Sequence, residues 1–306
     1  MEAEKKQPVR AGFAAILGKP NVGKSTLMNT LIGQKIAITS YKPQTTRSRI
    51  KTIYTDERGQ IVFLDTPGVH RGKSRLDEYM WKAAESTLKE VDLVLWLVEP
   101  KAKLDEEDRE ALELLRAVKT KVFLVINKID TVKKETILTV IAAYKDLLPF
   151  AEILPVSART KAGVEELRAA IFGALPEGAP FYDEELVTDE TQRNIAAEIV
   201  REKALRLLQD EVPHGIAVTV ESMKWRGRRE DEICDIEASI ICERESHKGI
   251  IIGKGGAMLR RIGTAARLDI EKMLECRVNL KLFVKVRRDW RDNAAQLGRF
   301  GYKEKG

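Results

Sequence analysis

The sequence predicts an α/β domain with a mostly parallel sheet and helices on both faces, followed by a smaller α+β domain. Short apolar runs followed by polar loops, as is typical of buried parallel strands, stand at 11–17, 60–64, 121–126 and 153–156. A segment rich in Pro and Gly at 175–182 then interrupts the chain. Beyond it the pattern changes to alternating strands and amphipathic helices, and 306 residues leave room for two domains.

The loop after the first apolar run carries the pattern G-x-x-x-x-G-K-S. Glycines at both ends of the loop allow backbone conformations closed to other residues, so that successive N–H groups can converge on a phosphate at the start of the next helix. We expect Lys24 to bridge β- and γ-phosphate oxygens and Ser25 to ligate Mg²⁺. The predicted nucleotide-binding residues of this loop are Gly18, Lys19, Pro20, Asn21, Val22, Gly23, Lys24, Ser25 and Thr26.

A second motif, N-K-I-D at 127–130, follows the apolar run 121–126 and therefore lies at the carboxyl end of a predicted strand. Asp130 can accept hydrogen bonds from the N1–H and the exocyclic amine of guanine, which adenine does not offer. A site built in this way discriminates by roughly 10⁴. The motif predicts a guanine nucleotide bound by Asn127, Lys128 and Asp130, and the backbone amides of Ser157 and Ala158 are expected to meet the guanine O6.

Two further segments predict a conformational switch. Asp65-Thr66-Pro67-Gly68 follows the apolar run 60–64, so that Asp65 can hold the hydration shell of Mg²⁺ and the Gly68 amide can reach a γ-phosphate oxygen. Thr66 and Pro67 complete this part of the nucleotide site. The polar segment 36–49 contains two threonines, of which Thr46 is slightly favoured over Thr45 as a metal ligand. The predicted metal ligands are Ser25, Thr46 and Asp65.

Taken in this order, the motifs resemble a P-loop GTPase domain of the translation-factor-related class, covering residues 8–177. The resemblance implies Mg²⁺-dependent hydrolysis of GTP to GDP and phosphate. Val69 stands where Ras-like GTPases place the glutamine that orients water, which implies slow intrinsic turnover. Asn21 resembles a potassium ligand of related GTPases, although it can also simply cap the loop. The implied catalytic residues are Lys24, Asn21, Thr46 and Gly68.

The second half of the chain contains another glycine motif. We expect a linker over 178–190 and then a helix of about twenty residues that ends before Pro213. Alternating apolar residues predict strands at 214–224, 235–243 and 278–287. Residues 253–256 spell G-x-x-G between a short apolar helix and a longer helix that ends near Leu274.

The order helix, strand, strand, helix, G-x-x-G, helix, strand resembles a type II KH domain over residues 191–290. Such a domain clamps about four nucleotides of single-stranded RNA, because its glycines let the backbone approach the sugar-phosphate chain closely. The RNA-binding residues implied by this resemblance are Ile252, Gly253, Lys254, Gly255, Gly256, Arg260 and Arg261.

The carboxy-terminal end concentrates positive charge. Residues 277–306 contain nine Lys and Arg against Asp289, Asp292 and Glu304, so this end carries as much net charge as the whole chain, +6. The basic residues 291–306 are predicted to form a tail. This charge attracts polyanions and agrees with a nucleic-acid partner.

A GTPase domain followed by this type of KH domain resembles a family of bacterial GTPases that act in the assembly of the small ribosomal subunit. The resemblance implies that the partners are GTP and GDP, the 3′ end of 16S ribosomal RNA and the 30S subunit, with peripheral association at the inner face of the cell membrane. Two alternatives remain open: a membrane-associated regulatory GTPase without an RNA role, and a P-loop ATPase or kinase with a nucleic-acid module. Asp130 discriminates against the ATPase or kinase.

The remaining sequence features bear on the cellular compartment of the protein. Residues 1–10 are charged, so we expect no signal peptide, and no apolar run approaches the roughly 18 residues of a membrane span. The three cysteines, Cys234, Cys242 and Cys276, are not at metal-binding spacing, which favours structural or idle thiols. We therefore expect a cytoplasmic protein. We also expect a monomer, although the sequence pattern does not determine the oligomeric state.

Overall fold

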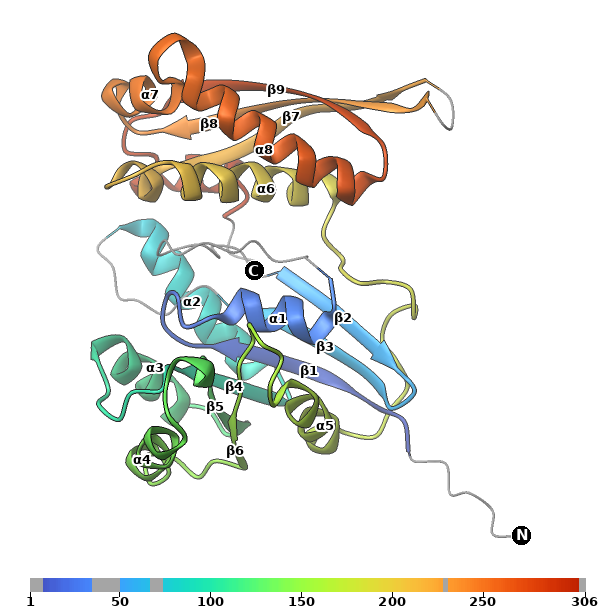
Figure 1. The fold of residues 1–306 in the computed structure, drawn as a ribbon, viewed down its shortest axis with the longest axis vertical. Coiled ribbons are helices and arrows are strands. Elements are labelled where there is room, and N and C mark those ends of the chain that lie inside the picture. The colour runs from blue at the N-terminus through green and yellow to red at the C-terminus, as the bar shows by residue number, and fades with distance from the viewer. Residues whose placement is uncertain (1–7, 35–49, 67–73, 228–230, 303–306) are drawn as a thin grey trace. The chain divides into compact units, whose positions relative to one another are not determined.

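The computed structural model describes residues 8–34, 50–66, 74–227 and 231–302. These residues form two compact units (Figure 1). Among the described residues, the first comprises 8–66 and 77–189, and the second comprises Ser74–Leu76 and the residues from Glu190 onward. Each unit encloses a hydrophobic core of its own.

The first unit is built on a six-stranded sheet in the order β2-β3-β1-β4-β5-β6. The strands β1 and β3 to β6 run parallel, and β2 pairs antiparallel with β3 at one edge. The bounds are β1 Arg10–Leu17, β2 Ile50–Asp56, β3 Gly59–Asp65, β4 Leu93–Val98, β5 Lys121–Ile126 and β6 Glu152–Pro155. The predicted mostly parallel sheet is therefore confirmed.

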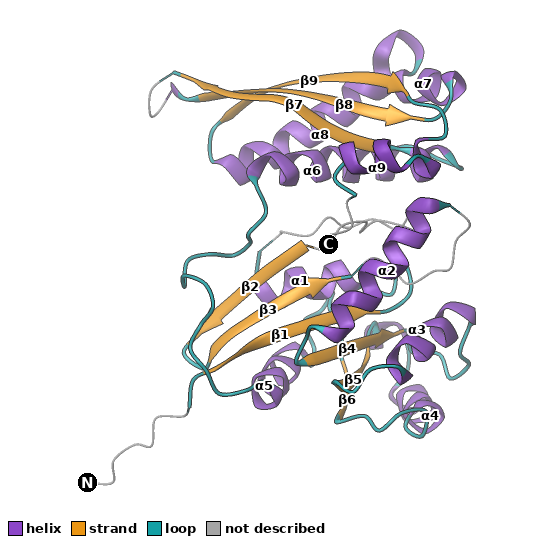
Figure 2. Cartoon of the chain, turned by 180° about the vertical axis from the view of Figure 1, so that it is seen from behind, coloured by secondary structure: helices purple, strands orange, loops and turns teal. Residues whose placement is uncertain are grey.

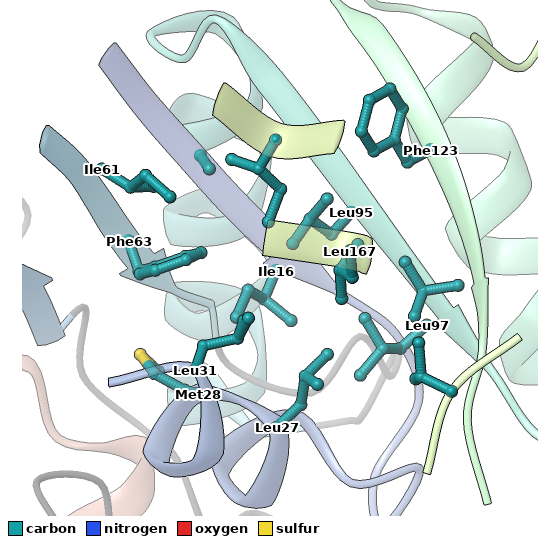
Figure 3. Close-up of a cluster of buried hydrophobic side chains, with 14 of the residues drawn as sticks. Ile16, Leu27, Met28, Leu31, Ile61, Phe63, Leu95, Leu97, Phe123 and Leu167 are labelled. Carbon is teal, nitrogen blue, oxygen red and sulfur yellow. The ribbon is translucent and has the colours of Figure 1, made fainter. Parts of the chain in front are cut away.

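Helices cover both faces of this sheet, as the sequence predicts. The helices are α1 Lys24–Ile32, α2 Arg75–Lys89, α3 Glu106–Arg116, α4 Lys134–Tyr144 and α5 Val164–Ala174. Helices α1 and α5 pack on one face, where Leu27, Leu31 and Leu167 meet Ile16 and Phe63 (Figure 3). Residues of α2, α3 and α4 join the core on the other face. Because both faces are covered, the central strands are apolar throughout, and all six residues of β4 are buried.

The segment after α5 returns along the edge of the sheet. The fully buried side chain of Gln60 in β3 accepts hydrogen bonds from the backbone N–H groups of Phe181 and Tyr182 and donates one to the Tyr182 carbonyl. The N–H of Ile53 in β2 donates to the carbonyl of Val187 over 2.8 Å. The segment predicted as a linker is thus hydrogen-bonded to β2 and β3 over part of its length.

The second unit contains a three-stranded sheet whose one face is covered by the helices α6, α7 and α8 (Figure 2). Strand β7 pairs antiparallel with β8, which pairs parallel with β9. The elements are α6 Gln192–Leu207, β7 Ala217–Arg226, β8 Ile233–Cys242, α7 Glu245–Ile252, α8 Ala257–Leu274, β9 Arg277–Val286 and α9 Ala294–Arg299. This order and pairing agree with the predicted smaller α+β domain.

Two parts of the second unit differ from the sequence-based expectation. Helix α6 spans 16 residues and ends at Leu207, earlier than expected, because Leu208 is extended and Asp210 has a φ of 54°. The predicted tail 291–306 contains helix α9. Just before this segment, the indole of Trp290 is fully buried and donates to the Gly215 carbonyl over 3.0 Å.

Candidate functional site

The loop between β1 and α1 has the backbone expected of a phosphate cradle. Gly18, Asn21 and Gly23 have φ values of 155°, 64° and 107°. A Cβ at Gly18 would lie 2.6 Å from the Leu97 carbonyl oxygen, and one at Gly23 would lie 2.3 Å from the Asn127 side-chain nitrogen. Both glycines are therefore required by close packing as well as by backbone conformation, and α1 begins directly after them at Lys24.

Lys24 lies inside this loop. Its ammonium group donates to the carbonyl oxygens of Gly18 and Lys19 over 2.8 and 2.9 Å. Burial lowers the pKa of Lys24 to about 8, against the opposing effect of the negative charge of Asp65. The side chain is thus held in the centre of the loop, where a phosphate group would restore the charge that burial disfavours.

Asp65 and Ser25 are the two predicted metal ligands that the structure describes. Asp65 is fully buried at the end of β3, beside Ile16 of β1 in the sheet register, and Ser25 is the second residue of α1. A carboxylate and a hydroxyl are ligands that Mg²⁺ prefers, so these residues fit the predicted ion. Thr66 is also buried, and its hydroxyl donates to the Ile16 carbonyl over 2.6 Å, which anchors β3 to β1.

Asn127 and Lys128 tie the end of β5 to the phosphate loop. The Asn127 amide donates to the Val22 carbonyl over 2.9 Å, and the Lys128 ammonium donates to the Asn21 carbonyl over 2.7 Å. Asn127 also accepts from the backbone N–H of Ala158. Three segments distant in sequence are therefore joined at the carboxyl ends of β1, β5 and β6.

The Asp130 carboxylate lies next to the loop after β6. One of its oxygens accepts from the Ser157 hydroxyl and the other from the Arg159 guanidinium. These contacts hold the pKa of Asp130 below its usual range, the bond from Ser157 being the largest cause. Asp130 is thus ionised and presents two acceptor oxygens side by side, as the recognition of guanine requires.

A cluster of charged side chains beside Lys19 was not anticipated from the sequence. The Lys19 ammonium pairs with Asp105 and Asp108 at the start of α3 and lies 3.8 Å from Glu99. Glu99 also accepts from Lys128 over 2.7 Å. The only sequence signal is the D-x-x-D spacing of Asp105 and Asp108, which forms a capping box at the start of α3.

Burial and hydrogen bonds set the charge of Glu99. Burial raises its pKa, but hydrogen bonds from Lys101 and Lys128 outweigh that effect and lower the pKa to about 2. Glu99 is therefore a permanent anion between Lys19 and Lys128 and connects the phosphate loop to the N-K-x-D motif.

Several predicted residues of the nucleotide site cannot be placed. Thr45, Thr46, Pro67 and Gly68 lie outside the described residues, as does Val69.

The G-x-x-G motif lies between α7 and α8 in the second unit. Gly253, Gly255 and Gly256 have φ values of 72°, 59° and 78°. A Cβ at Gly253 would lie 2.8 Å from that of Met258, whereas nothing lies within 4 Å of a Cβ built at Gly255 or Gly256. Gly253 is thus required by contact with α8, and the other two glycines leave their backbone open to a ligand.

Basic side chains surround this open backbone. Lys254, Arg260 and Arg261 are exposed, and within the described chain none of them forms an ion pair. Ile252 is partly buried next to the loop. This combination of accessible glycine backbone and unpaired cations suits the phosphates of a single-stranded nucleic acid.

The thiols and the membrane prediction can also be compared with the structure. Burial raises the pKa of Cys234 and of Cys242 to about 11, so neither is a reactive thiolate. Over the described ranges, no group of His, Cys, Asp and Glu side chains is arranged to hold a metal ion. None of the helices described is both long and apolar enough to cross a membrane.

Comparison with known proteins identifies relatives of the whole chain. Residues 13–128 match the family model described as 50S ribosome-binding GTPase, and residues 211–291 match the KH domain model. The chain is 51% identical to GTPase Era of Geobacter metallireducens over 96% of this chain and 98% of that protein. It is 48% identical to GTPase Era of Clostridium kluyveri over 96% of this chain and 100% of that protein.

Two solved structures share the complete fold. One is a crystal structure of Era in complex with MgGDPNP and nucleotides 1506–1542 of 16S ribosomal RNA, with a TM-score of 0.92 and 39% identity. The other is an Aquifex aeolicus Era variant bound to GDP·AlF4⁻, with the same TM-score and identity. Each match covers 97% of this chain and 100% of the solved chain.

Proposed function

The chain belongs to the Era family of GTPases, and we propose that it binds the 3′ end of 16S ribosomal RNA and acts in assembly of the small ribosomal subunit. It is a GTPase that uses Mg²⁺. We assign the nucleotide to residues 8–177 and the RNA to residues 191–290, with 178–190 connecting them. Convergence of the phosphate loop, Asp65, Asp130 and Ser157 at the carboxyl ends of four strands carries the nucleotide assignment.

In this proposal each described side chain has a distinct task. Lys24 exchanges its carbonyl partners for phosphate oxygens, and the N–H groups of the loop surround the β-phosphate. Ser25 and Asp65 hold Mg²⁺, which neutralises charge on the β- and γ-phosphates when bound. Asp130 accepts from guanine after Arg159 releases one of its oxygens.

Replacing Asp130 with Asn tests the guanine assignment. Xanthine carries a carbonyl in place of the exocyclic amine of guanine, so the side-chain amide introduced by D130N can donate where the Asp130 carboxylate accepts. D130N should therefore lose GDP affinity by roughly 10⁴ and gain affinity for xanthosine diphosphate. Calorimetry with GDP and with xanthosine diphosphate measures both changes in affinity. Unchanged GDP binding by D130N would contradict the assignment.

Asn21 supports a proposal about potassium. The residue is exposed on the phosphate loop, and its carbonyl is fixed by Lys128. A monovalent cation held there would supply positive charge during hydrolysis. Single-turnover GTP hydrolysis should be faster in K⁺ than in Na⁺, and N21A should remove the difference. Equal rates in the two salts for the parent protein would reject a role for K⁺.

The G-x-x-G loop supplies a matched pair of variants for the RNA assignment. Asn and Asp tolerate the left-handed backbone of Gly255 about equally, and a Cβ there meets nothing within 4 Å. G255D places a negative charge next to the RNA phosphates, whereas G255N adds nearly the same volume without charge. We expect G255D to bind an oligonucleotide of the 16S 3′ end at least tenfold more weakly than G255N.

We propose a cytoplasmic protein that is bound to its RNA, with membrane association at most peripheral. The buried Trp290 packs against Phe300 and Tyr302, so its indole is not available to enter a bilayer. Flotation with anionic vesicles tests for peripheral binding.

A further inference from the structure

The sheet of the second unit has a face turned away from its helices. Successive side chains of a strand point to opposite faces. In β9, Val284 and Val286 pack against the helix-covered core, so Lys285 between them lies on the other face, which we call the outer face. In β8, Ile240 and Cys242 belong to the core, which places Ile241 on the outer face as well.

Helix α9 and the outer face enclose a pocket of about 270 Å³. Its lining residues lie near the start of β7 and near the ends of β8 and β9. Its polar lining consists of Thr219, Glu221, Lys285, Arg287, Gln296 and Arg299. Three of these six side chains are cations and one is an anion.

The negative charge of Glu221 is neutralised by Lys285, another residue of the pocket. Glu221 lies at a β-bulge between Val220 and Ser222 and faces the outer side, where it accepts from Lys285 over 2.5 Å and from Ser239 over 2.7 Å. The hydrogen bond from Lys285 is the largest cause of the lowered pKa of Glu221. Lys285 and Glu221 therefore cancel each other at neutral pH.

The remaining cations have no anionic partner. Arg287 and Arg299 form no ion pair with any described residue, although both line the pocket. The pocket therefore carries a net charge of about +2. Two guanidinium groups on one recess form a site for an anion with several oxygens, such as a phosphate group.

Gln296 indicates what else the ligand must offer. Its side-chain oxygen is enclosed and has no hydrogen-bond donor among the described residues. An enclosed acceptor without a donor is costly, so rotation of the Gln296 amide toward a ligand that brings a hydroxyl or amine hydrogen would be favoured. A ribose next to a phosphate brings such a hydroxyl.

We propose that this pocket binds one nucleotide of RNA, with its phosphate on Arg287 and Arg299 and its ribose hydroxyl on Gln296. The inference rests on the proposed RNA-binding function and adds a second contact on the face of the sheet opposite the G-x-x-G loop. Strand β8 leads into α7 after Glu243 and Arg244, so the pocket and the loop lie at the same end of the sheet. One strand of RNA can therefore occupy both by passing around that end.

Two aromatic rings favour RNA over a lipid surface. Phe300 lines the pocket, and the half-exposed ring of Phe283 lies two residues before Lys285 on the same face, which offers bases a stacking surface. A lipid surface would instead need several apolar side chains to project together, and among the described residues beside the pocket only Phe283 is a half-exposed large apolar side chain. Phe300 packs edge-on against the buried Trp290 and is not free to project.

The test compares two RNAs and two double variants of the full chain. The short RNA has about four nucleotides and fills only the G-x-x-G groove, whereas the long RNA extends it by about ten. R287Q/R299Q removes the pocket cations. K224Q/R277Q removes the same charge from exposed residues at the other end of the outer face and serves as the control. Circular dichroism and thermal melting establish that both double variants fold.

We expect R287Q/R299Q to bind the long RNA about tenfold more weakly than the parent and to lower its salt slope by about 0.7, for one phosphate held on a single strand. Binding of the short RNA should not change. Replacing the extension of the long RNA with DNA should weaken its binding to the parent protein. The same replacement should not change its binding to Q296A. The control double variant should retain most of the affinity for the long RNA.

Each contrary result has a separate meaning. If the parent gains no affinity from the longer RNA, or if both double variants lose it equally, the pocket proposal is overturned while the groove stands. If R287Q/R299Q loses binding to phosphatidylglycerol vesicles but not to RNA, the pocket is a lipid site and the proposal is wrong. If the parent fails to bind even the short RNA, the proposed function itself fails.

Discussion

Lys19 of the phosphate loop and Asp108 of helix α3 form a buried ion pair, with 3.3 Å between the ammonium nitrogen and a carboxylate oxygen. Their side chains are only 9% and 3% exposed. The pair fixes the first residue after Gly18 to a helix on the far side of β4. It therefore links the conformation of the loop to the protonation of an acid in α3.

Asp108 should make stability depend on pH. Burial, followed by the effect of neighbouring Asp105, raises the pKa of Asp108 to about 6 against the attraction of Lys19. An acid with a raised folded-state pKa stabilises the fold fully below its unfolded pKa and loses that contribution as pH rises through the folded value. D108N lacks this dependence, so its stability relative to the parent should improve by about 1 kcal/mol between about pH 5 and about pH 7.5.

Urea unfolding at the two pH values measures the stability of D108N relative to the parent. Hydrogen exchange of the buried β4 amides in the native proteins gives a second measurement. A constant stability difference between D108N and the parent across the range would show that Asp108 does not titrate there.

Lys24 should make nucleotide affinity depend on pH in the range above neutrality. With a pKa of about 8 in the free protein, it is mainly charged at neutral pH and mainly neutral above about pH 8.5. Phosphate favours the charged form, so binding takes up a proton and weakens as pH rises. GDP affinity should fall about fourfold between about pH 7 and about pH 8.5. Calorimetry checks this, and the residual binding of K24Q should not vary with pH.

Two glycines of the α7 region should respond in opposite ways to alanine. Gly249 lies within α7, and a Cβ there would meet nothing within 4 Å, so G249A should stabilise by about 0.5–1 kcal/mol. Gly253 has a φ of 72° and no room for a Cβ beside Met258, so G253A should destabilise by at least about 1 kcal/mol. Thermal unfolding of the two variants compares them directly, and equal shifts would contradict the strain assigned to Gly253.

Gln60 should hold the connecting segment in place. Q60A removes four hydrogen bonds, three of them to the connecting segment, and leaves the amides of Phe181 and Tyr182 without their acceptor, which should cost about 1–3 kcal/mol. Limited proteolysis should then cut near Phe181 faster than in the parent. E184A changes an exposed residue of the same segment and is the control. Equal cutting rates for Q60A and E184A would count against the anchoring role.

The sequence predicted the nucleotide-binding motifs better than the ion pairs that hold their side chains in place. The phosphate loop and N-K-x-D were recognisable because each follows an apolar strand and has a fixed spacing. The pairing of Lys19 with Asp105 and Asp108 was not predictable, since it joins residues far apart in the chain through the sheet order. The contact of Arg159 with Asp130 depends in the same way on β6 lying next to β5.

The ends of some helices and strands were predicted well and the ends of others were not. Helix α8 ends at Leu274, as its apolar period indicated, and the alternating residues of β9 marked that strand to within one residue. Helix α6 was predicted too long because its apolar pattern continues to Leu208, whereas the positive φ of Asp210 depends on tertiary packing. Pattern alone does not show where packing overrides local propensity.

The backbone bonds of the connecting segment bear on self-association. An open edge strand offers a row of unused N–H and C=O groups to another chain, which makes it a template for aggregation. Ile53 of the edge strand β2 donates to Val187, and the Thr188 hydroxyl donates to the Lys51 carbonyl. At the opposite edge, β6 has only four residues. Detaching the connecting segment would therefore uncover β2 and expose the protein to edge-to-edge polymerisation while its core stays intact.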